Sequence, residues 1–110
     1  MKLLTKDITK RLPPLYSTSD KAPEDVSVVV KFFNPAGDST FYGTEYCPVQ
    51  KIFFGFVFHS LRDGELGYFS LDELSSVRAS FGLKIERDDW WNSSKSLKHV
   101  IESYQEGNPL

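Results

Sequence analysis

The chain has 110 residues and a formal net charge of −2. Its length predicts one domain over residues 1–110, and its composition is that of an ordinary soluble globular protein. This charge excludes both a strongly basic nucleic-acid-binding composition and the acidic excess of a DNA mimic. No apolar run is long enough to cross a bilayer. The single cysteine, Cys47, excludes an intrachain disulfide and favours the cytoplasm as the location.

The N-terminal part predicts a short helix and then a sheet. Thr5 can cap a helix that runs to about Leu12, where two prolines end it. From Val26 onward apolar residues alternate, which predicts strands over residues 26–33, 40–46, 51–61 and 65–70. Short links between these strands predict an antiparallel meander, and a fifth, short strand is expected within residues 83–91.

Two more helices are predicted after the meander. A Ser-Leu-Asp-Glu capping box from residue 70 predicts a helix that begins at Leu71 and ends at Gly82. A last helix is expected to begin near Ser94 or Ser96 and to end at Gly107. The predicted fold class is α+β: a four- to five-stranded, mainly antiparallel meander sheet with helices packed on one face.

The turns also predict how the strands pair. Residues 34–38 and 47–50 form short links, and Asp63-Gly64 is a typical two-residue hairpin turn. The cross-strand pairs that follow are Phe32 with Phe41, Gly43 with Phe54, His59 with Tyr68, and Phe58 with Phe69.

These pairs divide the side chains between two faces of the sheet. One is a core face that the helices must cover, in which Phe54, Phe56 and Phe69 should be buried. The other mixes apolar side chains with hydroxyl and charged groups. The core face carries Val26, Val28, Val30, Phe32, Phe41, Ile52, Phe54, Phe56, Phe58 and Phe69, and the mixed face carries Lys31, Tyr42, Thr44, Phe53, Val57, His59, Leu66 and Tyr68.

Glu45 is the first candidate for chemistry, because the register places it on the core face. A buried carboxylate has to be paired, hydrogen-bonded or neutral. Arg87, ahead of Arg78, is the expected partner, since the segment LKIERD returns to the sheet after the second helix. The pair is then either a structural ion pair or a poised acid or base.

The mixed face is the second candidate site, as a surface where aromatic and hydroxyl groups meet a partner. The alternative is a sheet back that the C-terminal segment covers. Such a face can also stack nucleobases, although Lys31 is its one basic residue. The candidate binding residues are Lys31, Tyr42, Phe53, His59, Tyr68 and Arg87.

Metal, cofactor and nucleophilic chemistry have no recognisable pattern in this sequence. The two histidines, His59 and His99, are far apart in the chain, and no paired-cysteine or paired-histidine spacing is present. No nucleophile-elbow motif occurs, and the segment Gly-Glu-Leu-Gly from residue 64 is turn and strand rather than a phosphate loop. We therefore predict neither a metal site nor a cofactor.

Several blocks of the sequence resemble one known family. They are LPPLYST, VVKFFNPAGDSTFYGTEY, FFGFV, ELGYFSLDELSSV and LKIERD, in this order. The family consists of small uncharacterised bacterial proteins, classed as a domain of unknown function and often carried by plasmids and other mobile elements. At residues 41–43 the chain has Phe-Tyr-Gly where relatives are expected to have Trp-Tyr-Ala. The resemblance implies a bacterial, mobile-element origin and implies no activity.

Three functions from different classes follow as hypotheses. The leading one is a non-enzymatic interaction module that binds a protein partner, such as a host factor. The alternative is a small hydrolase that uses Glu45 with an arginine or a second carboxylate. The third is a single-stranded nucleic-acid binder that uses Tyr42, Phe53 and Tyr68. The sequence does not identify the partner, a substrate or the oligomeric state.

Overall fold

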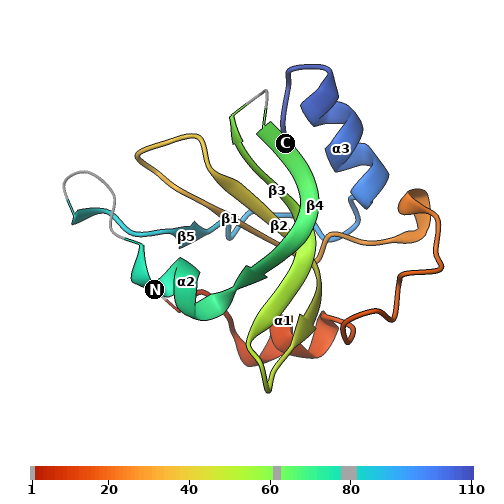
Figure 1. Cartoon of the computed structure of the whole chain (residues 1–110), viewed down its shortest axis with the longest axis horizontal. Helices are drawn as coiled ribbons and strands as arrows, with labels where there is room; N and C mark the ends of the chain where they lie inside the picture. Colours follow the sequence, from red (N-terminus) through yellow and green to blue (C-terminus); the bar gives the residue numbers. More distant parts are fainter. Residues whose placement is uncertain (1, 61–62, 78–81) are drawn as a thin grey trace.

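The protein is an antiparallel sheet with helices on both sides, and its α+β class is confirmed (Figure 1). The structure is a computed structural model that describes residues 2–60, 63–77 and 82–110. Within these residues the sheet has five strands in the order β4-β3-β2-β1-β5. Their bounds are β1 (Val30–Phe33), β2 (Thr40–Cys47), β3 (Ile52–Ser60), β4 (Asp63–Ser70) and β5 (Glu86–Arg87).

The helices begin where the sequence predicts, at polar caps. They are α1 (Lys6–Arg11), α2 (Leu71–Ser76) and α3 (Leu97–Gln105), with a short 3₁₀ turn η1 (Pro23–Asp25). The cap of each α-helix accepts a hydrogen bond from the third residue beyond it, as N-caps do: Thr5 from Ile8, Ser70 from Glu73 and Ser96 from His99.

The helix α2 is shorter than predicted, because it ends at Ser76 instead of Gly82. The first strand is also shorter than predicted and begins at Val30 instead of Val26. The segment before it lies along the start of α3: Val28 N donates to Lys95 O at 3.0 Å and Leu97 N donates to Val26 O at 2.8 Å. These two hydrogen bonds fix the beginning of α3 against the sheet.

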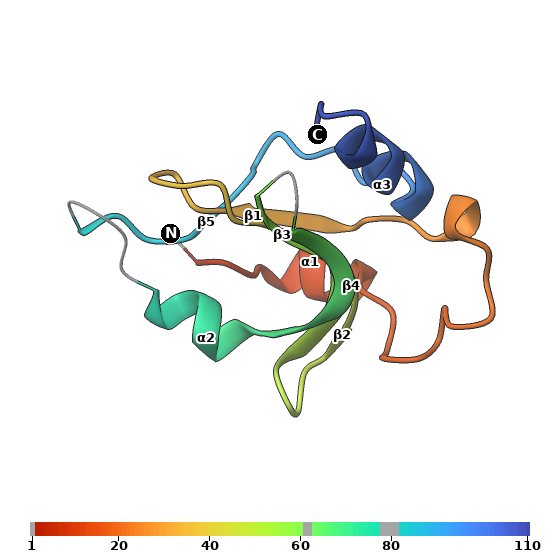
Figure 2. The ribbon, with the colours of Figure 1, turned by 45° about the horizontal axis from the view of Figure 1, so that its top comes forward.

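The helices cover both faces of the sheet, so the prediction of helices on one face is wrong. Figure 2 shows α3 on one side of the sheet, with α1 and α2 on the other. Leu74 of α2 packs in one apolar cluster with Phe32, Phe53 and Phe69. Leu97 and Val100 of α3 pack in a second cluster, together with Tyr42, Phe56 and Phe58.

The predicted register holds for the first hairpin and fails for the others. Phe32 pairs with Phe41, as predicted. Phe69 pairs with Phe53 instead of Phe58, and a shift by an odd number of residues exchanges the faces. The reason is that Asp63 and Gly64 lie inside β4 and do not form the turn, since Gly64 pairs with Phe58.

A bulge in β2 causes the other error. Gly43 pairs with Gly55 instead of Phe54, and the register between β2 and β3 shifts between Gly43 and Glu45. Glu45 therefore pairs with Phe54, and the bulge moves its side chain from the predicted core face to the other face of the sheet.

The predicted phenylalanine face is consequently divided between the two sides. Phe56 and Phe69 are buried as predicted, on opposite sides, whereas Phe54 is half-buried. Because both sides carry a core, the aromatic residues of β3 follow one another without a polar alternation. Val30, Phe32, Phe41 and Phe69 face α1 and α2, and Val26, Val28, Phe56 and Phe58 face α3.

Candidate binding site

The candidate site is built on a cross-strand row at the end of the sheet. Glu45 of β2 pairs with Phe54 of β3, and Phe54 pairs with Tyr68 of β4. The rings of Phe54 and Tyr68 meet edge to face with their centroids 5.1 Å apart. The Thr44 hydroxyl donates to the Phe54 carbonyl at 3.1 Å, and this bond stabilises the bulge that places Glu45 in the row.

Glu45 is buried, with 3% of its surface exposed, and it holds the loop after α1. Its Oε1 accepts a hydrogen bond from the Tyr16 amide at 2.8 Å, and its Oε2 accepts one from the Thr18 amide at 2.9 Å. The Thr18 hydroxyl also donates to Oε2. These donors satisfy the carboxylate, as a buried acid requires.

The prediction that Arg87 pairs with Glu45 is wrong. Its guanidinium donates to the carbonyls of Lys2 and Leu3 and pairs with Asp89 at 2.9 Å, so it ties the N-terminal segment to β5. Arg78 lies outside the described residues. The partners of Glu45 come instead from the loop after α1, and no residue spacing in the sequence indicates this contact.

Tyr16 has an unusual backbone and an exposed ring. Its φ angle is 71°, in the left-handed region that costs a residue with a Cβ roughly 1–2 kcal/mol. The bond from its amide to Glu45 offsets part of this strain. The ring is 67% exposed and lies 6.4 Å from the ring of Tyr68. A hydrogen bond with Tyr16, partial desolvation and the negative charge of Glu45 raise the pKa of Tyr68.

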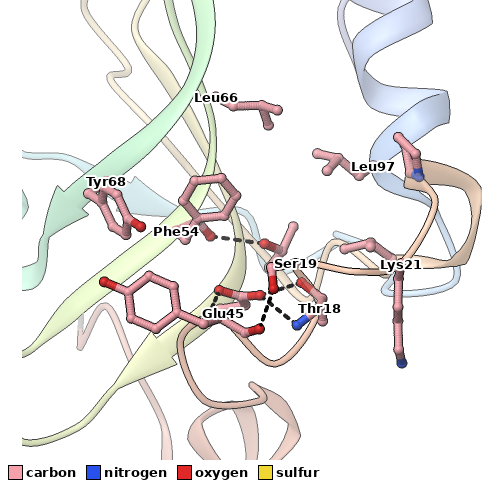
Figure 3. A pocket seen from close by; sticks show the side chains of 12 residues that line it. Thr18, Ser19, Lys21, Glu45, Phe54, Leu66, Tyr68 and Leu97 are labelled. Carbon is pink, nitrogen blue, oxygen red and sulfur yellow. Dashed lines mark hydrogen bonds between the residues drawn. The ribbon is translucent and has the colours of Figure 1, made fainter.

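These residues surround a pocket of about 260 Å³ between the sheet, the loop and the start of α3 (Figure 3). We call it the Glu45 pocket. Leu97 and Leu66 form apolar walls, and Lys21 points its ammonium group away from Glu45. Its lining residues are Tyr16, Thr18, Ser19, Lys21, Pro23, Val26, Thr44, Glu45, Phe54, Leu66, Tyr68 and Leu97.

The rim of the Glu45 pocket is apolar and accessible. Among the described residues, six large hydrophobic side chains are exposed, and three of them line this pocket. They are Tyr16, Leu66, which is 48% exposed, and Tyr68, which is 55% exposed. Exposed hydrophobic residues gathered around one concave site are typical of interaction surfaces, whereas scattered ones need no explanation.

The other predicted binding residues do not line the Glu45 pocket, although Lys31 and Tyr42 lie together elsewhere. Tyr42 and Phe53 are fully buried on opposite sides of the sheet. The Tyr42 hydroxyl donates to the Leu110 carbonyl, and burial raises the pKa of Tyr42. Lys31 lies 3.5 Å from Asp88 and over the rings of Tyr42 and Trp91, at 5.9 and 5.8 Å from the ring centroids.

His59 is not the cross-strand partner of Tyr68, because the true register places Phe54 opposite Tyr68. The His59 Nδ1 makes a hydrogen bond with the Ser39 hydroxyl at 2.8 Å, and the ring lies 6.1 Å from that of Phe41. Of the predicted site residues, Glu45 and Tyr68 share the pocket. Sequence reasoning missed Tyr16 and Thr18, which it did not single out as site residues.

The described residues contain neither a cluster of metal ligands nor a membrane-spanning helix. In residues 2–60, 63–77 and 82–110, no three histidine, cysteine, aspartate or glutamate side chains gather to hold a metal ion. In the same part of the chain, no helix has the length and apolar character needed to cross a membrane.

The comparisons with known proteins give a family and nothing more specific. No curated protein and no solved structure matches the chain. One family model matches residues 3–108, which is nearly the whole chain, and its description is "Protein of unknown function (DUF2958)". The chain therefore belongs to the DUF2958 family.

Proposed function

We propose that this protein is a non-enzymatic interaction module that binds a protein partner at the Glu45 pocket. The observation that carries the proposal is the gathering of exposed Tyr16, Leu66 and Tyr68 around one apolar hollow. Tyrosine rings supply a large contact area and a polar tip, and they are frequent anchors of protein interfaces.

The position of β4 supports an extended segment of the partner as the occupant. β4 is at the edge of the sheet and pairs with β3 alone in the described part of the chain. An edge strand presents backbone groups that a partner strand can pair with. Leu66 and Tyr68 stand on β4 beside this edge, so a segment added there would place its side chains at the pocket.

The resemblance to plasmid-borne bacterial proteins extends this proposal. A protein carried by a mobile element meets the proteins of the cell that receives it, so the partner is proposed to be a host factor in the bacterial cytoplasm.

The two alternatives have less support. A pocket at Glu45 favours the hydrolase, but no arginine and no second carboxylate line it among the described residues. Both oxygens of Glu45 are also engaged with the loop. The nucleic-acid alternative needs the rings of Tyr42 and Phe53 as a stacking surface, and both rings are fully buried.

A comparative pull-down tests the proposal. Tagged wild-type protein, Tyr68→Ala and Leu66→Ala are incubated with a lysate of the host bacterium, and bound proteins are quantified by mass spectrometry. Trp90→Ala is the matched control, because Trp90 is 94% exposed and does not line the pocket. We expect at least one protein that both pocket variants lose and that Trp90→Ala retains. Equal capture by all variants, or no capture by the wild type, would contradict the proposal.

A further inference from the structure

We propose that the Glu45 pocket takes the guanidinium group of an arginine from the partner segment, an inference that rests on the proposed function. The pocket combines a buried carboxylate with three aromatic rings, from Tyr16, Phe54 and Tyr68. A cation is the group that both features attract.

The carboxylate of Glu45 has hydrogen bonds but no counter-charge in the described residues. Its donors are two backbone amides and one hydroxyl, which are neutral. Lys21 lines the pocket, but it forms no ion pair with Glu45, and its ammonium group points away. A charge that is shielded from water by burial attracts a cation more strongly than an exposed charge does.

The remaining hydrogen-bonding capacity of Glu45 also fits a donor from outside. A carboxylate has about four acceptor positions on its two oxygens. The described residues fill three of them, one on Oε1 and two on Oε2. One position on Oε1 therefore remains for a donor that enters the pocket.

The three rings add attraction for a planar cation. Tyr68 meets Phe54 edge to face and Tyr16 edge to face, at 5.1 and 6.4 Å between centroids. The exposed faces of Tyr16 and Tyr68 are negative, and a guanidinium can stack on such a face. The volume of about 260 Å³ is below the roughly 300–1,000 Å³ of pockets that take whole ligands, which favours a single long side chain.

The same molecule already holds one cation in this way. Lys31 lies over the rings of Tyr42 and Trp91 and beside the carboxylate of Asp88. The Glu45 pocket presents the same combination of rings and a carboxylate, but the cation among its lining residues, Lys21, points away from the carboxylate. Arginine fits better than lysine here, because its flat guanidinium stacks on rings and donates to a carboxylate at once.

The test compares a charged probe with its neutral isostere. N-acetyl-arginine methylamide and N-acetyl-citrulline methylamide have nearly the same shape, and citrulline lacks the charge. Each is titrated into the ¹⁵N-labelled full chain, and amide shifts are followed by NMR. We expect the arginine probe to shift the amides of Tyr16, Thr18 and Tyr68, and to bind about tenfold more tightly than the citrulline probe.

Two variants separate charge from ring stacking. Glu45→Gln should bind the arginine probe about tenfold more weakly. Because this change also loosens the loop, Tyr68→Leu is the second variant: it keeps apolar area, removes the ring face and should weaken arginine binding several-fold. Trp90→Leu is the matched control and should leave binding unchanged.

Every outcome decides the inference. Preference for arginine that falls in both pocket variants and persists in Trp90→Leu supports it. Equal binding of both probes, shifts away from the pocket, or no binding at all would overturn it. The pull-down decides the proposed function separately: a partner that is lost by Tyr68→Ala while the two probes bind equally leaves the interaction module standing without the arginine.

Discussion

Replacing Glu45 by alanine should release the loop after α1 and lower the free energy of unfolding. The change removes the acceptor of two amide donors, Tyr16 N at 2.8 Å and Thr18 N at 2.9 Å, and of the Thr18 hydroxyl. A buried donor left without an acceptor costs about 1–3 kcal/mol. Because Tyr16 is exposed and Thr18 half-buried, water can reach these amides, and we expect a total loss of about 2–3 kcal/mol.

Urea unfolding followed by circular dichroism and fluorescence measures this loss. Trp91 is a suitable reporter, because its half-buried indole donates to the Val28 carbonyl at 2.8 Å and loses this environment on unfolding. The expected loss corresponds to a fall in Tm of roughly 8–15 °C. A loss below about 0.5 kcal/mol, the range of ordinary surface substitutions, would refute the view that Glu45 holds the loop.

A double-mutant cycle with Tyr16→Gly tests whether Glu45 maintains the strained backbone. Glycine adopts a positive φ without the Cβ clash, so Tyr16→Gly alone should recover about 1 kcal/mol, less what the Tyr16 ring contributes. Once Glu45→Ala has released the loop, residue 16 relaxes and the glycine brings no such gain. We therefore expect a coupling energy of about 1 kcal/mol. Strictly additive effects would show that the strain at Tyr16 does not depend on Glu45.

Three further predictions concern the fold. Gly55→Ala should destabilise the protein by at least about 3 kcal/mol, since its Cβ would lie 1.7 Å from the Tyr42 carbonyl oxygen. Gly67→Ala, whose Cβ would have nothing within 4 Å, should change the stability by less than about 0.5 kcal/mol. Equal urea midpoints for the two variants would contradict this. Ser70→Ala should cost about 1 kcal/mol in thermal melts through loss of the α2 cap, and an unchanged Tm would disprove the cap's contribution. Phe56→Ala should cost about 3–5 kcal/mol, and a loss as small as that of a surface residue would contradict its place in the core.

The helices could be predicted well because their signals are local. A serine or threonine cap followed by an apolar stripe indicates where a helix begins. Thr5 and Ser70 cap their helices as predicted, and of the two predicted starts of the last helix, Ser94 and Ser96, the cap is Ser96. Register could not be predicted in the same way. Gly64 is predicted in the turn but lies in β4 beside the Tyr104 ring, and a tertiary contact of this kind leaves no pattern in the neighbouring sequence.

The sequence predicted that Glu45 is buried, but it did not predict the residues that Glu45 contacts. The predicted register placed Glu45 opposite Ile52 on a core face; Glu45 is buried, but it pairs with Phe54 and lies on the other face of the sheet. The bulge after Gly43 decides which face it joins, and a register counted from turn lengths cannot detect an extra residue. Tyr16 and Thr18 come from a polar loop distant in the chain, so their contact with Glu45 required the structure.

The Glu45 pocket contains features that carry an energetic cost. An apolar residue at position 45 would avoid the desolvation of a buried carboxylate, and a glycine at position 16 would avoid the strain of a positive φ. The Tyr16 ring remains largely exposed, so it gains little from burial. Costs of this kind concentrate where a protein binds something. A partner that covers Tyr16 and Tyr68 and brings a cation to Glu45 would offset each of them, and this is the physical argument for the proposal that a partner binds at this pocket.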